Sequence, residues 1–137
     1  MMFKVKWLMM VMIALGISAC AEHITESRFP DGPPATPKVP GSIQAIFTQN
    51  CAVSLCHNGI QIPNLTSDVA YNSIVSISSS QGLNYIEPGD PDQSYLYLKI
   101  TGDSRIVGAR MPQGQAPLSN SDIAAIRTWI ENGAPAE

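Results

Sequence analysis

The chain has 137 residues and a formal net charge of −3, from 8 basic and 11 acidic side chains. Without its first 19 residues, which hold two lysines and no acidic residue, 6 basic side chains face 11 acidic ones and the net charge is −5. A chain this acidic is not expected to bind nucleic acid, because phosphates attract basic surfaces. A protein partner with a basic docking face is the natural expectation.

Residues 1 to 19 have the features of an export signal. Two lysines precede an apolar run at positions 7 to 17, which is too short to cross a bilayer. The sequence Ile17-Ser18-Ala19-Cys20 resembles a bacterial lipobox, in which the signal is cleaved before the cysteine and the cysteine is acylated. We therefore expect a lipoprotein signal peptide and lipidation of Cys20. A plain signal peptide that leaves this thiol free is the alternative.

Residues 20 to 41 are predicted to form a linker behind the lipid. Prolines stand at positions 30, 33, 34, 37 and 40, apolar residues are few, and no helical period is present. Such a segment stays extended and holds a domain clear of the membrane. Because Ala21 rather than an aspartate follows the cysteine, the usual sorting rule indicates the outer membrane in a Gram-negative host.

Residues 42 to 137 are predicted to form one all-α domain, because no stretch alternates with a period of two. Ser42 is placed to cap a first helix that ends at Cys51. Its apolar stripe is Ile43, Ile46 and Phe47. A short second helix is expected over residues 68 to 77. Its apolar face is Tyr71, Ile74 and Val75.

Two capping patterns predict the remaining helices. Asp90, followed by Pro91 and Gln93, favours a third helix that runs to Ile100 and is apolar nearly all round, hence buried. Ser119 and Asp122 form a capping box for a last helix, which Gly133 ends. The apolar line of this helix is Ile123, Ile126 and Ile130.

The segment Cys51-Ala-Val-Ser-Leu-Cys56-His57 has the pattern that fixes haem covalently. Each thiol adds to a vinyl group, and the histidine directly after the second cysteine is held beneath the iron. The spacer has four residues where the ordinary form has two, but the adjacency of Cys56 and His57 is kept. The segment therefore predicts one haem c, attached through Cys51 and Cys56, with His57 as an iron ligand.

Three other interpretations of these residues are open but less favoured. A disulfide between Cys51 and Cys56 would close a short loop and stabilise the fold by only about 2 kcal/mol. Zinc would need a fourth ligand, and neighbouring Cys and His side chains reach one tetrahedral ion poorly. A cysteine nucleophile with His57 as base would lack a third, orienting group.

Three segments beyond this one carry a resemblance to a known family. They are Ile86-Glu87-Pro88-Gly89-Asp90-Pro91-x-x-Ser94-x-Leu96-Tyr97-x-Lys99, Arg110-Met111-Pro112, and Leu118-Ser119-x-x-Asp122-Ile123-x-x-Ile126-x-x-Trp129-Ile130-x-x-Gly133-Ala134. Together with the cysteine motif they resemble a monohaem c-type cytochrome domain. The resemblance covers residues 42 to 134 and implies an all-α fold whose first and last helices cross beside the haem. It also implies single-electron transfer between redox partner proteins.

Met111 is the candidate for the second axial ligand. It is the only methionine after residue 12, whereas His23 lies in the linker and Lys99 would have to lose its proton and leave its helix. Ligation by histidine and methionine raises the potential relative to two histidines. This suits an acceptor of electrons from a quinol-linked chain or a donor to a terminal oxidase.

Several side chains are candidates to contact the haem. The alternative for each is that it is an ordinary loop or core residue. Arg110 and Arg105 are candidates to pair with a propionate, or are solvated loop cations. The aromatic candidates for lining the haem are Tyr85, Tyr95, Tyr97 and Trp129. We expect at least two of the three tyrosines to be core residues, and the tryptophan to pack near the haem from the last helix.

The expected function is that of a lipid-anchored, single-haem electron carrier on the outer side of the cytoplasmic membrane, not an enzyme. The first alternative is a haem enzyme module, such as a peroxidase or a dehydrogenase subunit, with an open iron site. The second is a haem-free surface lipoprotein that binds a protein and holds Cys51 and Cys56 in a disulfide.

Overall fold

The computed structural model describes residues 35 to 137. The predicted signal peptide, Cys20 and the greater part of the predicted linker lie outside the described residues. Residues Thr36–Glu137 form one compact unit. This unit starts a few residues before the predicted boundary at 42, because Val39 is buried at 3% exposure and the carbonyl of Lys38 accepts a hydrogen bond of 3.0 Å from the Glu137 N–H.

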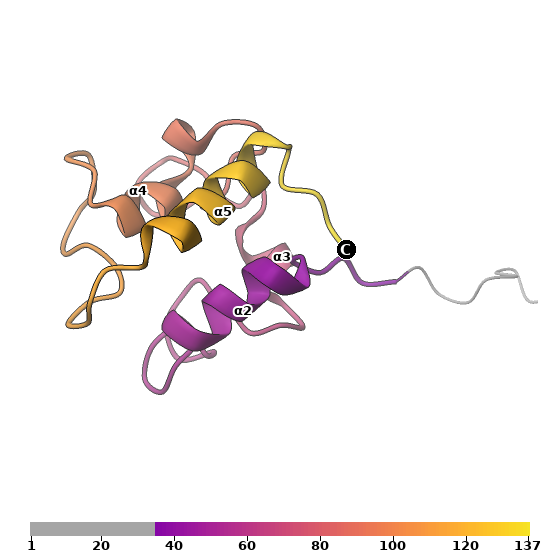
Figure 1. The fold of residues 1–137 in the computed structure, drawn as a ribbon, viewed down its shortest axis with the longest axis horizontal. Coiled ribbons are helices and arrows are strands. Elements are labelled where there is room, and N and C mark those ends of the chain that lie inside the picture. The colour runs from indigo at the N-terminus through magenta and orange to yellow at the C-terminus, as the bar shows by residue number, and fades with distance from the viewer. Residues whose placement is uncertain (1–34) are drawn as a thin grey trace, which may run out of the picture. The chain divides into compact units, whose positions relative to one another are not determined.

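The compact unit is all-α, as predicted. Its elements are α2 (Gly41–Asn50), α3 (Ala70–Ile74), a 3₁₀ turn η1 (Pro91–Gln93), α4 (Tyr95–Thr101) and α5 (Asn120–Glu131), as Figure 1 shows. Between residues 35 and 137 there is no strand, and the only extended pairing is two isolated bridges, Val75 with Ile86 and Ser78 with Asn84. Nor does this part of the chain contain a helix with the length and apolar character needed to cross a membrane.

The first helix, α2, buries the stripe that the sequence predicts and ends where expected. Ile43, Ile46 and Phe47 are at most 9% exposed, and Cys51 is the residue that follows the last turn. The predicted Ser42 cap is wrong, because the helix starts at Gly41 and Pro40 takes the cap position, two residues earlier than Ser42. The free N–H of Gly41 donates instead to the Glu137 carboxylate at 2.7 Å. A negative group is stabilising there because the N-terminus is the positive end of the helix dipole.

The second helix, α3, spans half of the predicted range. It ends at Ile74 because Val75 turns to extended backbone and bridges to Ile86. The predicted apolar face is kept: Ile74 is fully buried, and Tyr71 and Val75 pack partly buried against the core. The short helix therefore acts as one turn of core packing within a long irregular segment.

The third predicted helix is interrupted at Ser94. The Asp90 side chain accepts hydrogen bonds from the N–H groups of Asp92 and Gln93, as a cap should, but these residues form only η1. Ser94 is fully buried, and its hydroxyl donates to the Asp90 carbonyl at 2.8 Å while it accepts from the Glu87 N–H at 2.9 Å. The helix then restarts as α4, which is buried nearly all round as expected.

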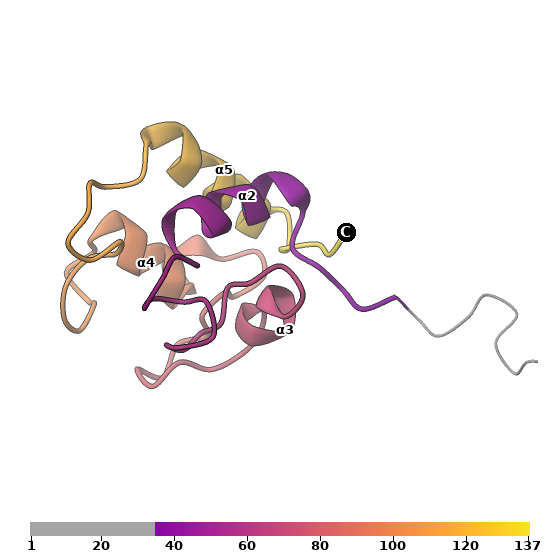
Figure 2. The same ribbon diagram turned by 90° about the horizontal axis from the view of Figure 1, so that it is seen from below.

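The last helix, α5, begins and ends as predicted. The Ser119 hydroxyl accepts a 3.1 Å hydrogen bond from the Asp122 N–H, and Gly133 takes the left-handed conformation after the last turn. Ile126 and Ile130 are fully buried. This helix packs against both α2 and α4, whereas the backbones of α2 and α4 do not approach each other closely. Figure 2 shows α5 beside α2 above the irregular segments.

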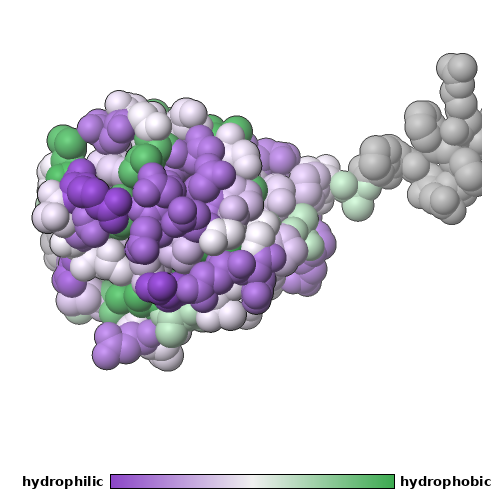
Figure 3. Space-filling view, turned by 90° about the horizontal axis from the view of Figure 1, so that it is seen from above, coloured by the Kyte–Doolittle hydropathy of each residue, from purple (hydrophilic) through white to green (hydrophobic). Residues whose placement is uncertain are grey.

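Apolar side chains that remain exposed are concentrated just after α2. Leu55, Ile60 and Ile62 are each at least 67% exposed. The face drawn in Figure 3 is mainly hydrophilic, with hydrophobic atoms in small separate spots. The segment from residue 51 to residue 67 contains no Asp, Glu, Lys or Arg, so the chain around these side chains is uncharged.

Candidate functional site

The cysteine motif folds into a tight turn at the end of α2. The N–H of Cys56 donates to the Val53 carbonyl at 3.0 Å, and the N–H of His57 donates to the Cys51 carbonyl at 3.1 Å. Leu55 takes a positive φ of 66° within the four-residue spacer. The turn thus brings Cys51, Cys56 and His57 to one place despite the longer spacer.

A backbone carbonyl fixes the orientation of the His57 ring. Its Nδ1 lies 2.9 Å from the carbonyl oxygen of Pro63. Because a carbonyl can only accept, Nδ1 carries the proton and donates. The lone pair of the neutral ring is then on Nε2, which is the arrangement of a metal-binding imidazole held by a second group.

Two further hydrogen bonds fix the segment that carries this carbonyl. The N–H of Leu65 donates to the His57 carbonyl at 2.8 Å, and the buried Gln44 side chain on α2 donates to the Leu65 carbonyl at 2.9 Å. The segment from His57 to Leu65, which forms one wall of the site, is therefore tied to α2.

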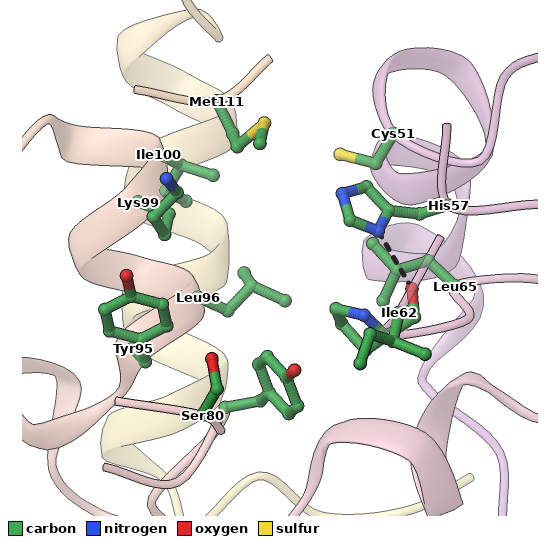
Figure 4. A pocket seen from close by; sticks show the side chains of 12 residues that line it. Cys51, His57, Ile62, Leu65, Ser80, Tyr95, Leu96, Lys99, Ile100 and Met111 are labelled. Carbon is green, nitrogen blue, oxygen red and sulfur yellow. Dashed lines mark hydrogen bonds between the residues drawn. The ribbon is translucent and has the colours of Figure 1, made fainter. Parts of the chain in front are cut away.

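Met111 belongs to the opposite wall, which α4 and the segment after it build. Its N–H donates to the Lys99 carbonyl at 2.9 Å, next to the buried side chains of Leu96 and Ile100. Figure 4 shows the Met111 thioether on one side of the pocket, pointing toward Cys51 and His57 on the other. Residues that are 54 positions apart in the sequence thus face each other.

The space between the two walls is a mainly apolar pocket of about 760 Å³, counting the part that opens to solvent. It is lined by Cys51, His57, Ile62, Pro63, Leu65, Ser80, Tyr85, Tyr95, Leu96, Lys99, Ile100 and Met111. A second hollow of about 560 Å³ adjoins it, shares Cys51, His57 and Met111, and adds Cys56 and several amide side chains.

Burial suppresses the reactivity of the first cysteine in this fold. Burial raises the pKa of the Cys51 thiol to about 11, and the neighbouring Cys56 thiol adds to the rise. The group therefore stays protonated at neutral pH and is a poor nucleophile. The raised pKa of Cys51 therefore weighs against the cysteine-nucleophile interpretation.

The nitrogen and sulfur atoms at the pocket are of the kinds that bind and attach haem. An imidazole nitrogen and a thioether sulfur face one cavity from opposite walls, both are common axial ligands of haem iron, and two thiols lie beside the imidazole. The apolar walls suit a flat apolar ring. Within residues 35 to 137, no group of three or more His, Cys, Asp or Glu side chains is placed to hold a metal ion, so zinc has no ligand set there.

The aromatic candidates divide between the pocket and the core. Tyr85 and Tyr95 line the pocket. Tyr97 packs in the core, with the Arg127 guanidinium 5.9 Å from the centre of its ring. Trp129 is also a core residue and does not line the pocket, because its indole N–H turns to donate to the Pro135 carbonyl at 3.0 Å.

The two arginine candidates lie outside the pocket. Arg105 pairs with Asp103 at 2.9 Å and so lowers the pKa of that carboxyl. Arg110 is exposed, and its side chain lies across Gly102 at the end of α4. Neither side chain is among those that line the pocket.

Several site residues were missed from the sequence. Pro63 acts through its carbonyl, and no residue pattern identifies a carbonyl acceptor. Leu96 and Ile100 stand one turn apart on a helix that is apolar all round, so sequence alone does not distinguish the face that lines a pocket from the face that fills the core. Lys99 also lines the pocket, a position that the charged residue's sequence context does not indicate.

Comparison with known proteins adds no assignment. A scan against protein-family models and searches of curated proteins and of solved structures each found no match to this chain. The site must therefore be interpreted from its own geometry.

Gly102→Ala tests the placement of Arg110 across α4. The new Cβ would lie 2.8 Å from the Arg110 Cδ, and the residue holds a φ of +75° that disfavours side chains. We expect a loss of more than about 1 kcal/mol in the free energy of unfolding, since the left-handed conformation alone costs about that much. Urea unfolding measures the change.

Gly108→Ala is the matched control, because Gly108 has the same φ of +75° but no atom within 4 Å of its added Cβ. Adding Arg110→Ala to Gly102→Ala should reduce the loss to that of the control. Equal losses for the two single variants would contradict this position of Arg110.

Proposed function

We propose that this chain is a lipid-anchored, single-haem c-type cytochrome that carries single electrons between extracytoplasmic redox partners. One observation carries the proposal: His57, presented by the turn after α2, and Met111, presented by the segment after α4, face each other across one apolar pocket with Cys51 and Cys56 beside the histidine.

The arrangement of helices supports a cytochrome c-like fold. The first helix of the unit, α2, packs on the last, α5, and the motif begins where α2 ends. This is the helix pairing that the resemblance implies. The pairing of α2 with α5 places the two cysteines at the edge of the core, where an attached apolar group would extend that core.

Haem bound here supplies a centre that gains and loses one electron at its iron. The described residues would serve that centre in three ways. His57 and Met111 would provide one nitrogen and one sulfur ligand, and the soft thioether would favour the reduced state. The apolar side chains of Leu65, Leu96 and Ile100 would keep water from the bound ring. With both ligands bound, a small molecule such as peroxide would find no open position at the iron.

The predicted anchor determines where the carrier works. A lipid on Cys20 followed by a proline-rich linker would keep the domain near a membrane, with freedom to reach partners. The donor and acceptor would both be extracytoplasmic proteins.

Covalent haem attachment is the first expected outcome. Expressed with a cytochrome c maturation system, the chain should be red, stain for haem after denaturing electrophoresis, and keep its haem through acid and acetone extraction. Cys51→Ala combined with Cys56→Ala should retain none, because no thioether can form.

Cys20→Ser serves as the matched control for cysteine loss and should stain as strongly as the wild type. Complete extraction of haem from the wild type would refute covalent attachment and leave the haem-free lipoprotein as the better interpretation.

Met111→Ala tests whether the protein is a carrier or an enzyme. The oxidised wild type should be low-spin and show the weak far-red absorption band of a sulfur-to-iron bond. The variant should lose this band, have a lower potential, and bind imidazole at least about tenfold more tightly, with peroxidase activity as a by-product. Visible spectra and ligand titration measure these changes.

Ser104→Ala is the control from the same segment, because Ser104 is exposed and lines neither hollow, and it should match the wild type in all of these properties. A wild type that is already high-spin and binds imidazole freely would show that Met111 is not the resting ligand. The haem-enzyme interpretation would then be preferred.

Lipid anchoring is tested by Cys20→Ser on its own. The variant should appear in the soluble periplasmic fraction or as a slowly processed precursor, with its haem still attached, whereas the wild type should fractionate with membranes. Wild type found wholly in the soluble fraction would exclude the anchor.

A further inference from the structure

Met111 lies in a long segment between α4 and α5 that has no helix of its own. Residues 102 to 119 are turns and bends, and Met111 itself is half-buried. A segment of this kind needs specific tethers if one of its side chains is to keep a fixed direction, because each mobile residue gains conformational entropy.

Lys99 supplies most of these tethers. Its Nζ donates to the Val107 carbonyl at 3.0 Å and to the Ala109 carbonyl at 2.6 Å. Its own backbone carbonyl accepts the 2.9 Å hydrogen bond from the Met111 N–H. An ammonium group has three donors and no acceptor, so it suits the task of joining two backbone carbonyls.

Tyr95 supplies the remaining tether from the same face of α4, one turn earlier. Its hydroxyl accepts the Val107 N–H at 3.2 Å. In the part of the chain described here, every hydrogen bond that joins residues 107 to 118 to another segment involves Lys99 or Tyr95. Hydrogen bonds therefore hold residues 107 to 118 to α4 alone.

We propose that Lys99 is a positioning residue that holds Met111 toward His57. Lys99 lies in the wall of the pocket beside Met111, and its amino group points to the backbone that immediately precedes the methionine. The inference rests on the proposed role of Met111 as an iron ligand. Lys99 acts through Met111 and is not itself the ligand, since its amino group is engaged by two carbonyls.

The test uses Lys99→Leu in the full-length protein matured with haem. The substitution keeps an apolar side chain at this position of the pocket wall, removes the donors and adds no sulfur that could bind iron. The far-red sulfur-to-iron band should weaken or disappear, and imidazole should bind at least tenfold more tightly. The amide hydrogens of Val107 and Met111 should exchange at least tenfold faster, with those of α5 unchanged.

Two variants serve as controls. Lys38→Leu removes a surface lysine whose partner is the exposed Asp68 at 3.4 Å, and it should behave as the wild type. Lys99→Arg restores several donors on a side chain of sufficient length and should recover the band at least in part. A general loss of structure would not be rescued in this way. If Lys99→Leu does not fold, Lys99→Gln, which stays polar and ends one bond earlier, is measured instead.

The outcomes separate this inference from the proposed function. Imidazole affinity within twofold of the wild type would overturn it, even if amide exchange became faster, because the segment would then be held without positioning Met111. A wild type that carries no haem would refute the proposed function. The exchange comparison would still report on the Lys99 tether in that case, and unchanged exchange would overturn the tether as well.

Discussion

The packing of α5 against both α2 and α4 is the constraint on which the site depends. Since the backbones of α2 and α4 do not approach each other closely, the fully buried Ile126 and Ile130 of α5 form the common support for two walls. One wall carries the cysteines and His57, and the other carries Met111. The distance between the walls, and hence the pocket, follows from where each helix crosses α5.

Each wall orients its own candidate iron ligand through hydrogen bonds within that wall. His57 is held by the Pro63 carbonyl, in a segment tied back to α2 through Gln44. Met111 is held by the backbone of Lys99 on α4. Among the residues described, no hydrogen bond joins the segment of His57 to the segment of Met111. The orientations of the two side chains are therefore fixed independently, and the side chains face each other only across the pocket. Metal ligation would be the link between them.

Local patterns predicted the elements well and their interruptions poorly. The stripe of α2 and the Ser119 cap of α5 depend on residues within one or two turns, and both are as predicted. The break at Ser94 depends on burial of its hydroxyl between two carbonyls and an N–H, which only the tertiary fold decides. Likewise, Trp129 turns its N–H to Pro135, and this preference for the core over the pocket is not encoded in helical spacing.

The burial of Cys51 bears on the order of events during maturation. The residue is only 9% exposed, at the edge of the core where α2 ends. It lines both hollows, so its thiol faces the space where a ligand would lie and not the outer surface. In a chain that acquires haem covalently, the vinyl group would therefore have to reach Cys51 from inside the pocket. Entry of the ring between the two walls would then come before formation of that bond.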